Sequence, residues 1–258
     1  MWESFMNSEW LFYLYTFLAC IGGGFVQSTS GFGFGIFVMV FFPLYLPVLQ
    51  ASGLCSLILI FLLSTLVWRY RKYIQWKHAV FPAAVYLVVS TVTIRLASSL
   101  NLSGINFWLG IFLLLIAIYM AFMSQKIKVK ANRGVAAVCA SLSGAVDGLF
   151  SIGGPPMTVY FLALLGNDKL KYLGTIQFFF LITNFANSFN RFTSGILESS
   201  TLCLVLPGIV GQFIGIRLGN RIVERIDSRH FQIFVYVFLA VSGILTCISS
   251  LFAGMRAG

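Results

Sequence analysis

Apolar segments separated by short polar or glycine-rich links fill almost the entire chain of 258 residues. A helix needs about 20 apolar residues to cross a bilayer, so the chain has room for at most about ten crossings and for no folded soluble domain. The pattern therefore predicts an all-helical polytopic membrane protein. Ten segments can be read, at approximately 10–25, 31–48, 51–68, 79–97, 105–124, 134–150, 153–166, 172–190, 199–217 and 231–252.

The composition excludes the soluble alternatives. Apolar residues make up 59% of the chain and charged residues 9%, whereas a soluble domain carries about 25% charged residues. So few charges cannot cover a surface that faces water, which excludes a soluble domain, a disordered chain and a secreted disulfide scaffold. The five cysteines all lie in apolar segments. We expect them to pack as small apolar side chains and to form neither disulfides nor metal sites.

Basic residues mark alternate loops of the chain. The loops after the third, fifth, seventh and ninth segments, at 69–77, 126–133, 169–171 and 217–229, hold 14 of the 17 lysines and arginines. Because basic loops stay on the cytoplasmic side, both termini are predicted to lie outside a plasma (inner) membrane that the chain crosses several times. The net charge of +10 is then a topology signal, and no nucleic-acid partner is expected.

Two of the segments are weak as independent spans. The second and the seventh follow their predecessors through glycine-rich links, at 22–35 and 144–156, and the seventh has only 14 residues. Each pair could form two full spans or one helical hairpin that enters the membrane and returns. We therefore expect short or re-entrant helices, broken at glycine, at these two places.

The two halves of the sequence resemble each other, as after an internal duplication. Residues 31–35 match residues 151–155 at an offset of 120, and residues 93–96 match residues 215–218 at an offset of 122. Each unit holds five segments, and an odd number requires the second unit to insert upside down relative to the first. We predict two inverted repeats, 1–133 and 134–258, within one integrated transmembrane domain. Inverted repeats are typical of secondary transporters, which hold substrate near the midplane where the repeats meet.

The two glycine-rich links are candidates for an anion site. A helix that begins at a glycine break presents free N–H groups and the positive end of its dipole. Such backbone is tolerated at membrane depth only when it is buried or lines a cavity. The alternative is that the glycines simply allow helices to pack closely. The candidate binding residues of the links are Gln27, Ser28, Ser30, Gly31, Gly33, Gly153 and Gly154.

Polar residues also gather in the eighth segment. At 100° per residue, one helix face collects Gln177, Asn184, Asn187, Ser188 and Arg191. Such a face lines a substrate or ion pathway, or it joins helices through hydrogen bonds. We include Gln177, Asn184 and Asn187 among the candidate substrate contacts.

Three further charges lie in or near the membrane. Asp147, in the second glycine-rich link, is the one acid within the ten apolar segments, and it could carry a coupling proton or cation or cap the next helix. Arg95 and Arg217 occupy matching places near segment ends. They could contact substrate, although arginines at such places usually extend to the membrane surface.

The residues needed for enzymatic chemistry are scarce. The chain has seven acids and two histidines in total, no His-Glu-x-x-His sequence and no acid pair within the segments. We therefore expect no catalytic residues, no metal and no cofactor. An anion channel is the main alternative to a transporter, and an intramembrane enzyme is a weaker one. A small anion and the lipid bilayer are the expected partners, and a homodimer is left open.

The glycine-rich stretches invite comparison with a known family. Residues 27–35, followed by Pro43, and residues 144–156 resemble the two signature stretches of the sulfite exporter TauE/SafE family, and the basic loop at 68–76 is similar too. The resemblance covers essentially the whole chain. Ser151 and Pro155 stand where the family often has glycine. The resemblance implies a permease for sulfite, sulfonates, sulfoacetate or similar sulfur-containing anions. Combined with the repeats, it predicts a secondary transporter that works by alternating access and is coupled to protons or another ion.

Overall fold

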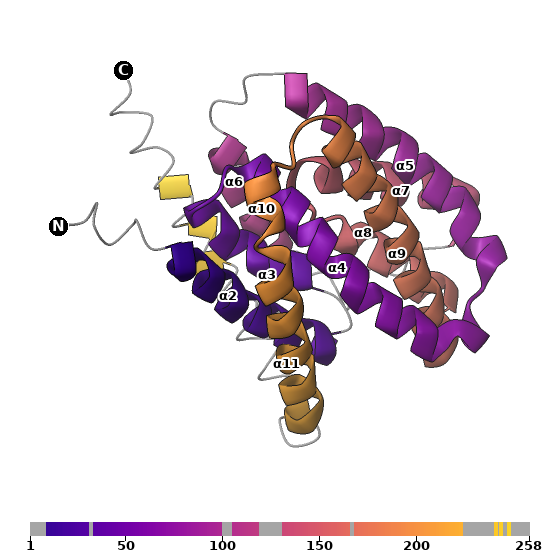
Figure 1. Ribbon diagram of the computed structural model, residues 1–258. Helices are drawn as coiled ribbons and strands as arrows, with labels where there is room; N and C mark the ends of the chain where they lie inside the picture. Colours follow the sequence, from indigo (N-terminus) through magenta and orange to yellow (C-terminus); the bar gives the residue numbers. More distant parts are fainter. Residues whose placement is uncertain are drawn as a thin grey trace.

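The computed structural model describes residues 9–30, 33–99, 105–118, 131–165 and 168–223, with three helical fragments at 240–241, 243–244 and 247–248. These residues form helices joined by turns and include no strand (Figure 1). The first half contains α2 (Glu9–Ser30), α3 (Phe34–Phe41), the 3-10 turn η1 (Phe42–Leu44), α4 (Val48–Tyr70), the 3-10 turn η2 (Arg71–Tyr73), α5 (Trp76–Ser99) and α6 (Ile105–Ile118). The second half contains α7 (Arg133–Phe150), α8 (Gly154–Leu165), α9 (Lys169–Thr193), α10 (Ser199–Leu202) and α11 (Val205–Val223).

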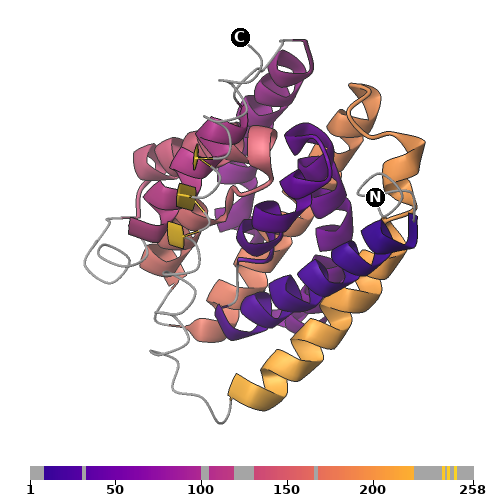
Figure 2. The same cartoon turned by 90° about the vertical axis from the view of Figure 1, so that its left-hand side faces the viewer.

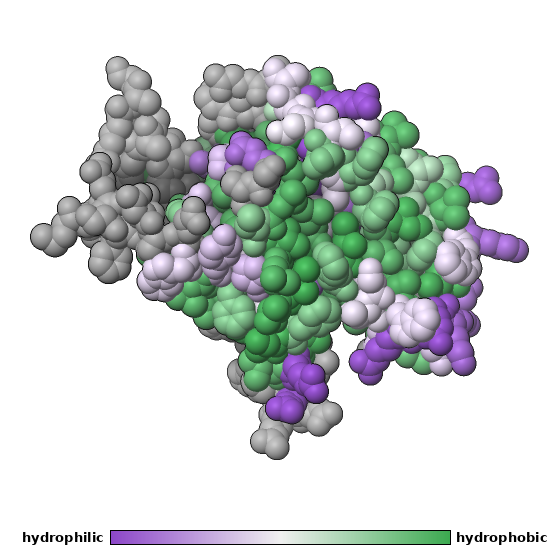
Figure 3. All heavy atoms as spheres, in the orientation of Figure 1, coloured by the Kyte–Doolittle hydropathy of each residue, from purple (hydrophilic) through white to green (hydrophobic). Residues whose placement is uncertain are grey.

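The lengths and the apolar surfaces of the helices suit a membrane. Four of them are long and apolar enough to cross one, at Trp10–Ser28, Val48–Tyr73, Trp76–Ser99 and Arg133–Phe150. Apolar side chains cover most of the face in Figure 3, and hydrophilic ones gather where α4 meets α5 and where α11 ends. The prediction of an all-helical, multi-pass membrane protein is therefore confirmed. The tenth predicted segment, 231–252, lies almost entirely outside the described residues.

The two weak segments form helices that are too short to cross a bilayer. At 1.5 Å per residue, the eight residues of α3 extend about 12 Å and the twelve of α8 about 18 Å, against a hydrocarbon core of about 30 Å. The second predicted segment is also divided, because α3 stops at Phe41 and is followed by η1 and a turn. Of the two arrangements that the sequence allows, helix lengths favour hairpins, α2–α3 and α7–α8.

The helix breaks are much narrower than predicted. The prediction of a non-helical link over 22–35 is wrong in its length, because α2 continues through three glycines to Ser30. The expected link at 144–156 is wrong in the same way, since α7 continues to Phe150. These helical glycines serve close packing: a Cβ at Gly144 would lie 2.6 Å from the carbonyl oxygen of Tyr86 in α5, and one at Gly24 would collide with the backbone of Gln212 in α11. The packing alternative is thus correct for the glycines inside the helices.

Helices of the first half pack mainly against helices of the second half. Helix α2 packs along α11, α7 packs along α5, and α4 pairs with α9 between them. Figure 2 shows α2 and α11 side by side along most of their length. Each hairpin is therefore held mainly by a helix of the other half, and the interruptions in the two hairpins come together beside α4 and α9.

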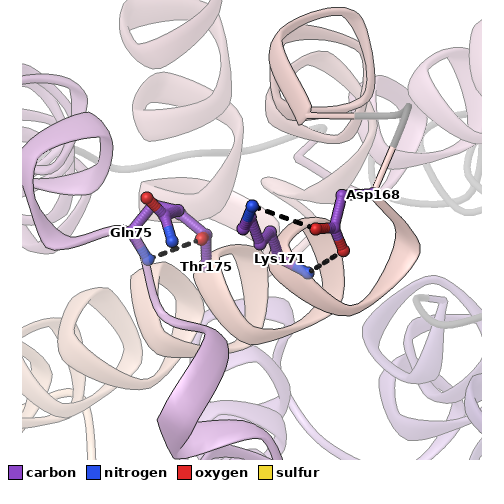
Figure 4. A network of polar contacts seen from close by, with 4 residues as sticks. All are labelled: Gln75, Asp168, Lys171 and Thr175. Carbon is purple, nitrogen blue, oxygen red and sulfur yellow. Dashed lines mark hydrogen bonds and ion pairs between the residues drawn. The ribbon is translucent and has the colours of Figure 1, made fainter.

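One loop contact links two of the basic regions (Figure 4). The backbone N–H of Gln75 donates to Thr175 Oγ1 of α9 at 3.0 Å. Asp168 caps α9 by accepting from the N–H of Lys171 at 3.1 Å, and the same two residues form an ion pair. The basic loops at 69–77 and 169–171 therefore lie on the same side of the protein, as the alternating charge pattern requires.

Candidate functional site

The two helix breaks lie against each other. Gly33 precedes α3 with φ 109°, and Ser151 ends α7 with φ 57°. Both values fall in the left-handed region, which lets the chain turn sharply between two helices. A Cβ on Gly35 would lie 2.5 Å from the carbonyl oxygen of Ser151. The absence of a side chain at Gly35 therefore allows the start of α3 to touch the second break.

A small pocket of about 50 Å³ lies at this meeting point, enough for a few water molecules or one small oxyanion. Its apolar walls are Ile36, Leu59, Leu63, Ile152 and Phe180. Its other lining residues are Gln27, Gly33, Gly35, Tyr86, Asp147, Ser151, Gly153, Gly154 and Asn184. Six of these, Gln27, Gly33, Asp147, Gly153, Gly154 and Asn184, are residues that the sequence singled out.

The start of α3 supplies backbone donors to the pocket. Gln27 Oε1 accepts from the first N–H of the helix, that of Phe34, at 3.0 Å. The N–H of Phe37 is already bonded to the carbonyl of Gly33. The N–H groups of Gly35 and Ile36, which have no partner within the helix by its geometry, lie between them at the positive end of the dipole. Both residues line the pocket, so this turn is suited to an anion.

The start of α8 is poorer in donors. Its first three residues are Gly154, Pro155 and Pro156, and proline has no N–H. The prolines occupy the first turn as expected. They leave the N–H groups of Gly154 and Met157 as the first-turn donors, so the two breaks are not equivalent anion sites.

Asp147 is the one buried carboxylate among the described residues. Only 3% of its surface is exposed. Its Oδ2 accepts from the side-chain amide of Asn187 in α9, and Asn187 Oδ1 accepts in turn from the hydroxyl of Ser90 in α5 at 2.8 Å. Asn187 does not line the pocket and instead orients the carboxylate that does.

Arg191 is the second buried charge, and it is fully buried. Its guanidinium donates to Ser56 Oγ at 2.6 Å and to the carbonyl oxygens of Asp147 and Gly148. Ser56 is bonded to Ser151 Oγ at 2.7 Å. Arg191 thereby caps the C-terminal end of α7, where the helix dipole is negative, and it reaches the pocket through two serine hydroxyls.

Two side chains present polar atoms without partners to the pocket. The hydroxyl of Tyr86, fully buried, makes no hydrogen bond of good geometry within the described part of the chain, although the Asp147 carboxylate and the Thr183 hydroxyl lie near it. Asn184 donates to the carbonyl of Phe180 at 2.9 Å, and its Oδ1 has no donor. A buried polar atom without a partner is costly, so both atoms are available to a ligand.

The other predicted contacts lie elsewhere. Ser28 bonds the carbonyl of Phe25 and faces Gly219 of α11. Gln177 is buried in α9 but does not line the pocket. Arg95 and Arg217 are exposed on the outside of α5 and α11, because both residues fall on the helix faces turned away from the core. Gly31 and the side chain of Ser30 are outside the described residues.

Four polar or charged side chains were missed from the sequence as site residues, those of Ser56, Tyr86, Ser151 and Arg191. The backbone donors of Gly35 and Ile36 were missed as well. Arg191 had a detectable signal, because it shares the polar face of α9 with Asn184 and Asn187. The hydroxyls had none, since single serines and tyrosines are common in apolar helices. In the parts of the chain that the structure describes, no cluster of three His, Cys, Asp or Glu side chains could hold a metal ion.

These features define a class: a multi-pass helical membrane protein with a charged pocket between two interrupted helices. The model of the family described as sulfite exporter TauE/SafE matches residues 16–246, so the chain belongs to this family of membrane permeases for sulfur-containing anions. The resemblance that rests on the two glycine-rich stretches is thereby confirmed. No curated protein and no solved structure is significantly similar to the chain.

Proposed function

We propose that the protein is a secondary transporter that carries a small sulfur-containing anion across the plasma membrane by alternating access. One observation carries the proposal: interrupted helices from the two halves meet around a pocket that combines free helix-start amides with a buried carboxylate. Interrupted helices of this kind form the substrate and ion sites of many transporters. The family match supports the class of substrate.

Binding is assigned to the α3 side of the pocket. The N–H groups of Gly35 and Ile36 and the hydroxyl of Tyr86 are the donors for the oxygens of the anion. The volume of about 50 Å³ favours a compact ion such as sulfite or a short sulfonate over a large organic acid. The apolar wall of Ile36, Leu63 and Phe180 suits the carbon end of a sulfonate.

The inverted-repeat arrangement is part of the proposal. The exchange of partners, α2 with α11 and α7 with α5, is the pattern that a two-fold axis in the membrane plane produces. The shared side of two basic loops supports the same topology, with both termini outside. Movement of the α2–α3 and α11 group against the α7–α8 and α5 group would open the pocket to either side in turn.

The orientation has its own test. In a cysteine-free variant, Lys72→Cys places a thiol on an exposed side chain of the predicted cytoplasmic loop. An impermeant thiol reagent added outside intact cells is expected to leave it unmodified and to react after the membrane is permeabilised. Rapid reaction in intact cells would overturn the orientation.

The function is tested by flux in proteoliposomes. We expect saturable movement of a sulfur anion from a panel of sulfite, thiosulfate, sulfoacetate, methanesulfonate, an organic carboxylate and chloride. Gly154→Leu should abolish it, because a Cβ at Gly154 meets only Phe180, at 4.0 Å, and the larger side chain would fill the pocket without straining the backbone. Fast, non-saturating flow of several anions including chloride would instead identify a channel.

A further inference from the structure

The charges at the pocket indicate how many protons accompany each transported anion. This inference rests on the proposed function. Asp147 and Arg191 are the two charged side chains buried within the described residues. They are not joined as an ion pair, because the guanidinium bonds the backbone carbonyl of Asp147 and not its carboxylate. The protein alone therefore contributes one positive and one negative charge, which balance each other formally but are held by different partners.

A bound anion upsets this balance. A single negative charge added to these two leaves one negative charge uncompensated in a low-dielectric interior, which is strongly unfavourable. A proton on Asp147 removes one negative charge, so the anion is then balanced by Arg191. We infer that the site binds a singly charged anion together with one proton on Asp147, with Arg191 as the permanent countercharge.

Arg191 is fixed in its charge and in its position. A guanidinium does not lose its proton in proteins. Three hydrogen bonds, to Ser56 and to two carbonyls at the end of α7, hold it in place. Its link to the pocket runs through Ser56 and Ser151, so the positive charge acts on the ligand without direct contact.

Asp147 is the group that can take up the proton. The titratable or charged groups that face it from the packed helices are Tyr86 of α5, Cys55 of α4 and Arg191 of α9. The phenol and the thiol are neutral at physiological pH in their ordinary ranges. Helix α6 has no titratable side chain, and the tyrosine of α8, Tyr160, lies beside Cys139 instead. Among the groups at the pocket, Asp147 is therefore the one to which the proton is assigned.

The transport step balances without any other ion. A proton and an anion enter from one side, the carboxylate of Asp147 becomes a carboxylic acid, and both leave on the other side as the carboxylate forms again. The net charge moved is zero. A doubly charged anion would leave one negative charge uncompensated, so the site selects hydrogensulfite over sulfite and a sulfonate over sulfate.

The experiment uses the full-length protein in proteoliposomes, with labelled methanesulfonate as the singly charged probe and sulfate as the doubly charged one. The potential is set with potassium and valinomycin, and the pH gradient is set independently. We expect methanesulfonate uptake to follow the pH gradient, to ignore the potential, and to exceed sulfate uptake by about tenfold or more.

Variants separate a countercharge from a structural role. Arg191→Gln should weaken methanesulfonate binding by about a hundredfold, while Arg191→Lys, which retains the charge, should be slower but still electroneutral. Asp147→Asn should convert uptake to a pH-independent flux that moves one negative charge per anion. The matched controls are Arg133→Gln and Asp168→Asn, which remove charges on solvent-accessible side chains outside the pocket and should behave as the wild type.

The outcomes distinguish two failures. Saturable flux of methanesulfonate that moves net charge in the wild type, or sulfate transport at the same rate, would overturn the inference and leave the proposed function intact. Equal loss in Arg191→Lys and Arg191→Gln, with wild-type stoichiometry in the residual flux of both, would reduce Arg191 to a structural cap. Absence of saturable flux for any anion would overturn the proposed function and the inference with it.

Discussion

The two helix breaks have the same residue spacing but carry different polar side chains. Helices α2 and α7 end at Ser30 and Phe150, and the helices after them begin at Phe34 and Gly154, each pair at an offset of 120 residues. The same offset relates Gln27 to Asp147. The first break thus carries a neutral amide and the second a carboxylate at the equivalent position, each buried and each lining the pocket.

The partners of these two side chains differ as well. Gln27 accepts from the N–H of Phe34 and so stabilises its own hairpin. Asp147 accepts from Asn187 of α9 and lies beside the end of α7 that Arg191 caps. In addition, α8 begins with two prolines, whereas α3 keeps its first-turn N–H groups. This difference agrees with the proposed division of roles, in which the first break offers donors to an anion and the second offers a carboxylate that binds and releases a proton.

The largest effect is expected where the two breaks touch. Gly35→Ala places a methyl group 2.5 Å from the carbonyl oxygen of Ser151. Because this oxygen belongs to the backbone and cannot rotate away as a side chain could, the two breaks must move apart. A displacement of about 1 Å at a binding site can cost about a hundredfold in rate, so we expect flux to fall by that order. Initial rates of methanesulfonate uptake, corrected for reconstituted protein, measure it.

The matched control is Gly154→Ala, in the other break. Its added Cβ meets only Phe180, at 4.0 Å, so transport should fall much less than in Gly35→Ala. If the two variants were equally active, contact between the breaks would not matter for transport.

The next largest effect is expected at Asp147, the carboxylate that stands in the second break where the first has the neutral Gln27. Asp147→Asn should abolish accumulation driven by a pH gradient, because no proton can be bound and released, while exchange of labelled for unlabelled anion across the membrane persists. Asp168→Asn is the control, since asparagine still caps a helix. Accumulation that continues to follow the pH gradient in Asp147→Asn would remove this residue from coupling.

A smaller effect is expected at the neutral break. Gln27→Ala removes the acceptor of the Phe34 N–H, a change similar to loss of a helix cap, which costs about 1 kcal/mol, or about fivefold in apparent affinity. The pH dependence of transport should be unchanged, in contrast to Asp147→Asn. A shifted pH profile in Gln27→Ala would show that the two breaks do not divide their roles as described.

The class of protein could be predicted from the sequence because it depends on amounts: apolar content, segment length and the placement of basic residues. The extent of the breaks could not. Glycine permits both a helix interruption and close helix packing, and only the neighbours, such as Tyr86 beside Gly144, decide between them.

The candidate site was predicted in part for the same reason. Asp147, Gly33 and Gly154 stand out as unusual residues in apolar sequence, and the structure places all three at the pocket. Arg191 was underrated, while Arg95 and Arg217 were preferred because they occupy matching places in the two halves. Position along the helix does not reveal which arginine faces inward, and that depends on how α9 packs against α4 and α5.

The smallest effect is expected at the surface. Hydrogen bonding from the N–H of Lys171, together with its ammonium group, lowers the pKa of Asp168. The ionised form is therefore favoured in the fold, so its contribution is present above the ordinary aspartate pKa and is lost as the pH falls through the lowered value. Since the pair is exposed, Asp168→Asn should leave thermal stability near neutral pH within error. A large loss of stability would mean that the start of α9 depends on this cap.

In the proposed mechanism, an anion occupies the pocket between the breaks and the pocket opens to each side in turn. Gly154→Cys in a cysteine-free variant tests it most directly, because a side chain there enters the pocket without a clash. A small impermeant methanethiosulfonate reagent should modify this thiol from outside and, in inside-out vesicles, from the cytoplasmic face, and methanesulfonate should slow both reactions. Modification from one face only, or at a rate that no anion changes, would contradict this mechanism.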